Sequence, residues 1–105
     1  MNDKIRDELT DGLFDAILSL EDREECYRFF EDLCTVSEIK SLASRLRVAS
    51  LLSKGHTYTE IFELTGVSTA TISRVNRCLE YGADGYRTVL DRISHNLPDG
   101  KETPE

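Results

Sequence analysis

Short hydroxyl-bearing and cationic side chains gather in one stretch of the sequence, between residues 68 and 77. They are Ser68, Thr69, Thr71, Ser73, Arg74 and Arg77, with the methyl group of Ala70 among them. Small hydroxyl and methyl groups can touch the edges of base pairs, and arginine reaches guanine or phosphate. No acidic residue interrupts the stretch before Glu80. A helical hairpin with a purely structural role would tolerate Glu or Asp there, so the pattern favours contact with the major groove of DNA.

Presenting such a surface to a groove requires two short helices that cross steeply, joined by a turn of about three to four residues. The first helix is expected over residues 57–65, with Ile61 and Leu64 on its inner side. Gly66 follows it and tolerates the positive φ that a tight turn needs. The next residue, Val67, is apolar and is expected to hold the turn against the core.

The second helix of the pair is expected over residues 68–81. Ile72, Val75 and Leu79 recur at helical spacing and give it an inward apolar stripe. The hydroxyl and arginine side chains then occupy the outer face. Residues 57–81 are therefore predicted to form a helix-turn-helix that binds DNA.

Contacts with the phosphate backbone are expected from the elements around this pair. Arg45, Arg47 and Lys54 lie on the preceding helix, where a phosphate contact and a solvated helix face are equally good interpretations. Thr57 and Tyr58 begin the first helix of the pair, where backbone N–H groups and hydroxyls often hold a phosphate. Tyr58 fits an aromatic position at the edge of the core equally well.

The rest of the chain also has apolar side chains at helical spacing, and no stretch shows the alternation of a strand. The further helices are expected over residues 4–20, 22–34, 35–54 and 84–96. Ser19–Asp22 and Thr35–Glu38 have the pattern of a capping box, which predicts where two of these helices begin. Gly55 and Gly82 are predicted stops. The fold class is thus all-α with six helices.

One domain is expected over residues 1–96, because a chain of 105 residues has no room for a separate catalytic domain. Residues 97–105 are polar, contain Pro98 and Pro104, and are predicted to be a disordered tail. A single copy of so short a chain buries a modest core, so a second copy is expected to help hide its apolar faces.

The net charge of −7 is unevenly distributed along the chain. Residues 1–34 hold 4 Lys and Arg against 11 Asp and Glu, whereas residues 35–81 hold 6 against 4. The predicted helix-turn-helix therefore lies in the basic part, and local charge matters more than total charge for phosphate contact. The acidic residues 1–34 form an amino-terminal arm. This arm also supports an alternative hypothesis, in which the chain is a non-enzymatic module that binds a basic protein or another partner.

Several other classes of protein are disfavoured. Cys26, Cys34 and Cys78 form no C-x-x-C and are expected as small core residues in a reducing compartment. His56 and His95 lie far apart in the sequence, so no metal and no other cofactor is expected. Acids fall on solvated faces and no phosphate cradle is visible, so an enzyme is not expected. Without a signal peptide or an apolar run of about 20 residues, the prediction is a soluble cytoplasmic protein with no membrane contact.

The motif Thr69-Ala-Thr-Ile-Ser-Arg74, which follows the glycine turn, resembles the recognition helix of the Trp repressor superfamily. The similarity extends through Ser41-Leu-Ala-Ser-Arg-Leu-Arg47 and Leu51-Leu-Ser-Lys-Gly55, and covers residues 35–79. The arm over residues 18–34 resembles the YerC/YecD-like branch of that superfamily.

This resemblance implies an intertwined homodimer, in which residues 4–34 of two chains wrap each other as dimerisation arms. It also implies a transcriptional regulator, in particular a repressor. The helix-turn-helix heads (residues 57–81) of two chains related by two-fold symmetry would lie about 34 Å apart, which is one turn of DNA. Such a dimer would favour a palindromic operator.

The resemblance further implies an effector pocket. Arg45 and Arg74 match the carboxylate partner and the ring-sandwiching arginines of the family, and Thr35 and Thr71 match positions that line its pocket. The small residue that follows the recognition-helix arginine in the family is Val75 here. Its β-branched side chain would crowd an indole ring, which argues against tryptophan and leaves the effector unknown. Arg45 and Arg74 would then contribute to packing, form an ion pair or contact DNA.

Overall fold

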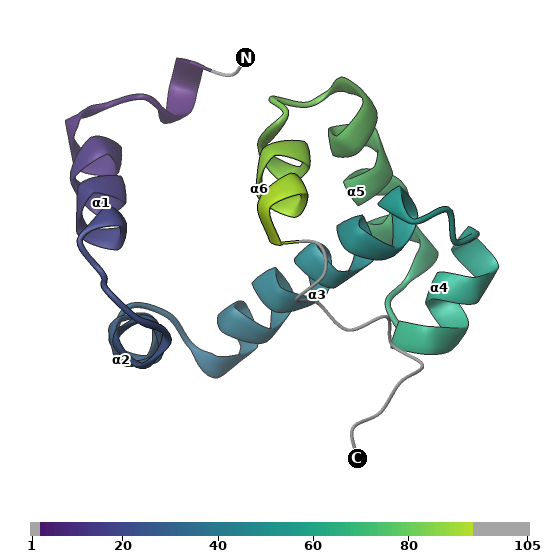
Figure 1. Cartoon of the computed structure of the whole chain (residues 1–105), viewed down its shortest axis with the longest axis horizontal. Helices are drawn as coiled ribbons and strands as arrows, with labels where there is room; N and C mark the ends of the chain where they lie inside the picture. Colours follow the sequence, from purple (N-terminus) through teal and green to yellow (C-terminus); the bar gives the residue numbers. More distant parts are fainter. Residues whose placement is uncertain (1–2, 94–105) are drawn as a thin grey trace. The chain divides into compact units, whose positions relative to one another are not determined.

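Helices account for the regular structure of residues 3–93, which are the residues described by this computed structural model. The elements are η1 (Asp3–Ile5), α1 (Glu8–Leu18), α2 (Arg23–Leu33), α3 (Val36–Ser53), α4 (Tyr58–Thr65), α5 (Thr69–Tyr81) and α6 (Gly85–Ile93), shown in Figure 1. Six α-helices and no strand occur within the described range, so the all-α prediction is confirmed. The tail predicted over residues 97–105 and the last three residues of the helix predicted over 84–96 lie outside it.

The chain divides into two units, residues 1–39 and residues 40–105. The described part of the second unit contains the hydrophobic core. Its buried members are Val48, Ala49, Leu51, Ile61, Ile72, Val75, Leu79 and Leu90. Helices α3, α4, α5 and α6 each contribute at least one of these side chains, so the core fixes the two helices of the predicted helix-turn-helix.

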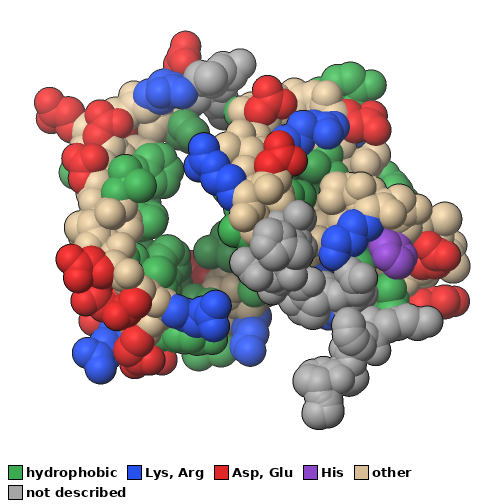
Figure 2. Space-filling model, viewed as in Figure 1, with side chains coloured by type: hydrophobic (Ala, Val, Ile, Leu, Met, Phe, Trp, Pro, Cys, Tyr) green, Lys and Arg blue, Asp and Glu red, His purple; other side chains and the backbone are tan. Residues whose placement is uncertain are grey.

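The first unit differs because none of its described residues is buried. Leu9 and Leu18 of α1 are 88% and 81% exposed, although both belong to the apolar stripe that the sequence predicts. The space-filling view shows acidic side chains over α1 and α2, with hydrophobic side chains exposed between them (Figure 2). The first unit thus does not bury these apolar side chains within itself.

The helix-turn-helix predicted over residues 57–81 is present as α4 and α5. Gly66 ends α4 in the left-handed conformation, at φ 75°, and its N–H donates to the Phe62 carbonyl. Val67 packs against the core, as its position after the glycine predicts. Ser68 then caps α5 by accepting a hydrogen bond from the Thr71 N–H. The turn therefore has the chemistry that the sequence indicates.

The two ends of α1 differ from the sequence prediction. The helix begins at Glu8 rather than near Lys4, because the Asp7 carboxylate accepts the Thr10 N–H and caps it there. Ser19 was predicted to cap the second helix, and this is wrong: it ends α1, while Asp22 caps α2 by accepting the Glu25 N–H. An ionised carboxylate three residues before an open N–H is the stronger acceptor at both sites.

Two further expectations need correction. Cys26 and Cys78 are exposed and Cys34 is only partly buried, so none of the three is the core residue that the sequence predicts. Gly82 does end α5, but at φ −87° rather than in the left-handed region. Glycine fits there for a different reason, since a Cβ would collide with the Cys78 carbonyl oxygen.

Candidate nucleic-acid interface

Helix α5 separates its side chains into two faces. Ile72, Val75 and Leu79 are buried, as the apolar stripe predicts. The side chains that the sequence selects for DNA contact lie off this stripe, where they are exposed or partly buried. They are Ser68, Thr69, Ala70, Thr71, Ser73, Arg74 and Arg77. The buried face fixes the helix while the outer face remains available to a ligand.

The amino-terminal end of α5 combines local order with positive potential. The Ser68 hydroxyl donates to Thr71 Oγ1 at 3.1 Å and accepts the Thr71 N–H at 3.2 Å, so both hydroxyls are engaged in the cap. The first turn contains no acidic residue. No carboxylate in this turn therefore offsets the partial positive charge of the helix amino terminus. This partial charge favours the binding of an anion nearby.

Thr57 begins α4 through reciprocal hydrogen bonds with Glu60. The Thr57 N–H donates to Glu60 Oε1 at 2.9 Å, and the Glu60 N–H donates to Thr57 Oγ1 at 3.1 Å. His56 Nδ1 lies 3.5 Å from the same carboxylate oxygen. The hydrogen bond from the Thr57 N–H, reinforced by His56, lowers the pKa of Glu60. The structure gives Thr57 a capping role, while its contact with phosphate stays a prediction, as does that of the neighbouring Tyr58, 37% exposed.

The basic residues of α3 have different surroundings. Arg45 donates to the Ser41 hydroxyl at 3.3 Å. Arg47 is partly buried, and its Nε is fully enclosed with no hydrogen-bond partner among the described residues. Lys54 is exposed just beyond the end of the helix. Of these three cations, Arg45 and Lys54 are thus more accessible than Arg47.

A polar cavity of about 270 Å³ lies between α3, α5 and α6. Its lining residues are Ser41, Arg45, Thr71, Arg74, Val75, Cys78 and Tyr86. Three of the four residues expected in an effector pocket therefore surround one cavity. Thr35, the fourth, belongs to the first unit.

Tyr86 and Cys78 line the cavity, although the sequence does not predict either of them as a site residue. Burial raises the pKa of the Tyr86 phenol. The neighbouring Cys78 thiol acts in the same direction, and Arg45 and Arg74 act against it. Tyr86 shares helical spacing with Val89 and Leu90, which is the pattern of a packing residue rather than of a site residue. Only the meeting of α6 with α3 and α5 reveals its place beside the two arginines.

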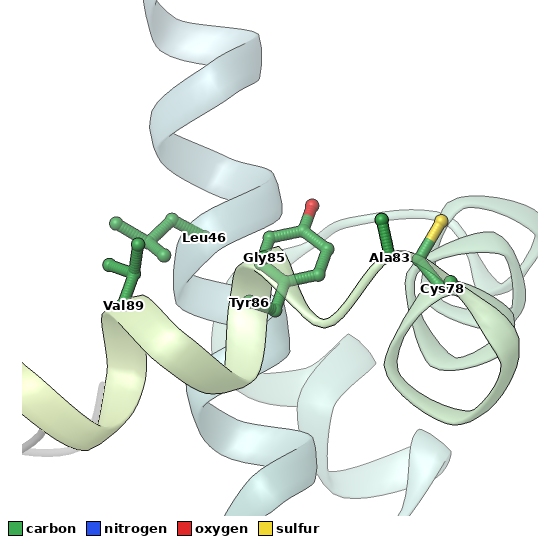
Figure 3. Close-up of a pocket in the computed structure, with 7 residues that line it drawn as sticks. Leu46, Cys78, Ala83, Gly85, Tyr86 and Val89 are labelled. Atoms are coloured by element: carbon green, nitrogen blue, oxygen red, sulfur yellow. The ribbon is translucent and has the colours of Figure 1, made fainter. Parts of the chain in front are cut away.

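An apolar groove of about 460 Å³ adjoins this cavity and shares Cys78 and Tyr86 with it. Figure 3 shows Tyr86 in the middle of the groove, with Leu46 and Val89 toward one end and Cys78 and Ala83 toward the other. The groove is therefore built from α3, α5, α6 and the α5–α6 link.

Two other kinds of function gain no support from the described residues. Within residues 3–93, no group of three or more His, Cys, Asp or Glu is placed to hold a metal ion. None of the described helices is long and apolar enough to cross a membrane.

The fold and the α4–α5 pair define an all-helical protein of the helix-turn-helix class. The sequence model of the Trp repressor protein family matches residues 8–94, and the chain belongs to this family, which is a family of transcription regulators. The resemblance seen in the sequence is thereby confirmed.

Individual relatives agree with this assignment. The chain is 62% identical over 91 residues to the uncharacterized protein YerC of Bacillus subtilis, covering 87% of this chain and 88% of that protein. A TrpR-like protein from Eubacterium eligens has a crystal structure that superimposes with a TM-score of 0.84 at 54% identity, covering 88% of this chain and 95% of that chain. A solved structure from Staphylococcus aureus matches with a TM-score of 0.85 at 56% identity, covering 89% and 94%. The six-helix Trp repressor-like fold is thus established.

Proposed function

We propose that this chain is a sequence-specific DNA-binding transcription regulator that acts as a repressor. The observation that carries the proposal is the outer face of α5, which is polar and cationic. The first turn of this helix has no acidic residue, and its opposite face is a buried apolar stripe. Membership of the Trp repressor family supports it. Such a regulator would act in the cytoplasm, with no enzymatic activity and no bound cofactor.

The proposed contacts divide into two groups. In the major groove, α5 would use Ser68, Thr69, Ala70, Thr71, Ser73, Arg74 and Arg77. Thr57, Tyr58, Arg47 and Lys54 would contact phosphates and set the orientation of the head, because backbone contacts position a protein while base contacts specify the sequence.

The uncovered arm supports a homodimer. Leu9 and Leu18 expose apolar surface that a monomer rarely leaves in water, and residues 4–34 would cover such surface in a second copy. Each protomer would then be one domain over residues 1–96, in which α6 (Gly85–Ile93) is the last described helix. Two helix-turn-helix heads in a two-fold dimer would recognise a palindromic operator, with half-sites about 34 Å apart.

The cavity beside α5 is proposed as an effector pocket with Arg45, Thr71 and Arg74. Val75 and Tyr86 also line the cavity, so their side chains compete with an aromatic ring for its volume. We infer that tryptophan is not the effector. Titration calorimetry with L-tryptophan is expected to show no binding, and a saturable heat would contradict this.

The proposed function is tested by selecting bound duplexes from a random DNA pool. Wild type is compared with Arg74→Ala plus Arg77→Ala, and with Arg23→Ala plus Arg28→Ala on α2 as a control that removes the same charge. A palindromic motif that persists in the control and disappears in the α5 variant is expected. Failure of wild type to enrich any motif would contradict the proposal.

The acidic arm keeps one alternative open, a module that binds a basic protein partner. The charge of −7 over residues 1–34, which includes 11 acidic residues, favours it. Substitution of acidic residues on α2 would then abolish capture of the partner, whereas Arg74→Ala would leave it intact.

A further inference from the structure

The carbonyl end of α5 is completed by a residue from the next helix. The last four carbonyls of an α-helix have no partner within it. In α5, the Cys78 carbonyl accepts the Gly82 N–H at 2.9 Å. The Leu79 carbonyl accepts Arg87 Nε at 3.0 Å, and Arg87 lies eight residues further on, in α6. This contact joins the guanidinium of one helix to the backbone of the other.

The charge of Arg87 suits this position. The carbonyl end of a helix carries a partial negative charge, which a nearby cation stabilises. The last turn of α5 has no basic residue of its own and contains the acidic Glu80. Arg87 therefore supplies from α6 the cation that α5 lacks.

The link between α5 and α6 restricts how the two helices can move. Gly82 lies so close to the Cys78 carbonyl that a Cβ would collide with it, and Asp84 has a positive φ of 67°. Leu79 of α5 and Leu90 of α6 are both buried in the same core. The hydrogen bond from Arg87 thus closes a short, tightly turned connection.

We propose that Arg87 is a positioning residue for DNA recognition, which sets the direction of α5 without touching DNA. The inference rests on the proposed regulator function. A helix of 13 residues is about 20 Å long, so a tilt of about 5° at its carbonyl end moves its amino-terminal part by ~2 Å. Base contacts need side chains held to within about 0.5 Å, so loss of the Arg87 contact misplaces Arg74 and its neighbours.

The experiment compares wild type with Arg87→Ala and Arg87→Lys, and uses Arg92→Ala, an exposed arginine on the same helix, as the control. The readout is the ratio of the Kd for a scrambled duplex to the Kd for the duplex that wild type selects. It is measured well below the melting temperature of every variant and at several salt concentrations. Circular dichroism confirms that each variant is folded.

Arg87→Ala is expected to reduce this ratio about tenfold, while the slope of log Kd against log salt stays unchanged. Arg87→Lys should restore most of the ratio because an ammonium group donates to a carbonyl, and Arg92→Ala should match wild type. An unchanged ratio in Arg87→Ala overturns the positioning role. So does a salt slope lower by about one, the mark of a direct phosphate contact. Failure of wild type to select any duplex overturns the regulator function itself, and the positioning role with it.

Discussion

Thr57 and Glu60 exchange hydrogen bonds across the first turn of α4, each accepting on its side chain the backbone N–H of the other. The pair fixes the start of the helix-turn-helix immediately after the loop that leaves α3. Both residues are exposed, so the arrangement depends on these hydrogen bonds rather than on burial.

Thr57→Ala is expected to lower the free energy of unfolding by about 1 kcal/mol, because one orphan N–H of α4 loses its acceptor. Thr57→Ser keeps the hydroxyl and should behave as wild type within a few tenths of a kcal/mol. Urea denaturation at equal protein concentration measures both. Equal loss in the two variants would show that the methyl group of Thr57 matters and the cap does not.

Acid should weaken the same cap. The Thr57 N–H and His56 lower the pKa of Glu60 below its ordinary value of 4.5. A carboxyl whose pKa is lowered by folding stabilises the fold at pH above its unfolded pKa, and loses this effect as the pH falls through its folded pKa. NMR titration should place the Glu60 midpoint below 4.5. The difference in urea midpoint between wild type and Glu60→Gln should shrink across the same range, and a constant difference would contradict this account.

A cap of this kind can be predicted from the sequence because both partners lie within three residues of each other. The same holds for Thr35 and Glu38 at the start of α3, where the two reciprocal bonds are also present. Ser19 fits a similar pattern yet ends α1, where its hydroxyl donates to the Ala16 carbonyl at 2.6 Å, and Asp22 caps α2 instead. Local pattern therefore identifies the helices but does not always identify the residue at which each one begins.

Properties that depend on distant elements could not be predicted from the sequence. Tyr86 reaches Arg45 and Arg74 only after α6 has packed against α3 and α5, and no local signal marks it. Likewise, the spacing of the apolar residues in α1 places Leu9 on an apolar face of the helix. This spacing cannot say whether another surface covers that face.

Ser50 offers a prediction about the core. It is 1% exposed on α3, and its hydroxyl has no hydrogen-bond partner among the described residues. An unsatisfied buried hydroxyl is destabilising, so Ser50→Ala should raise the free energy of unfolding by about 1 kcal/mol and Tm by ~4 °C. The control is Ser44→Ala, at an exposed position of the same helix, with little expected change. A lower Tm for Ser50→Ala would show that the hydroxyl has a partner in solution.

Gly82 and Gly85 give a matched pair in the α5–α6 link. A Cβ on Gly82 would collide with the Cys78 carbonyl, whereas a Cβ on Gly85 meets nothing within 4 Å. Gly82→Ala must therefore shift the backbone and should cost about 1–3 kcal/mol. Gly85→Ala should be neutral or stabilising by up to about 1 kcal/mol. Thermal unfolding of the two variants tests both expectations. Equal Tm values would show that the link relaxes around the new Cβ without loss of stability.

The exposed arm yields the most direct test of the dimer. Leu9 is 88% exposed within one chain, near the amino terminus of α1, where a carboxylate suits the helix dipole. Leu9→Asp should therefore leave the helix intact. If a second copy covers Leu9, the change removes about 2 kcal/mol of apolar burial per copy and places a charge in the interface.

Sedimentation equilibrium should then show a dimer for wild type and a dimer dissociation constant at least about a hundredfold weaker for Leu9→Asp, since two symmetric contacts are lost. Gly12→Asp adds the same charge to α1 at a site with nothing within 4 Å, and serves as the control. Unchanged dimerisation in Leu9→Asp would exclude this face of α1 from the interface. Weaker dimerisation in both variants would point instead to general repulsion by the acidic arm.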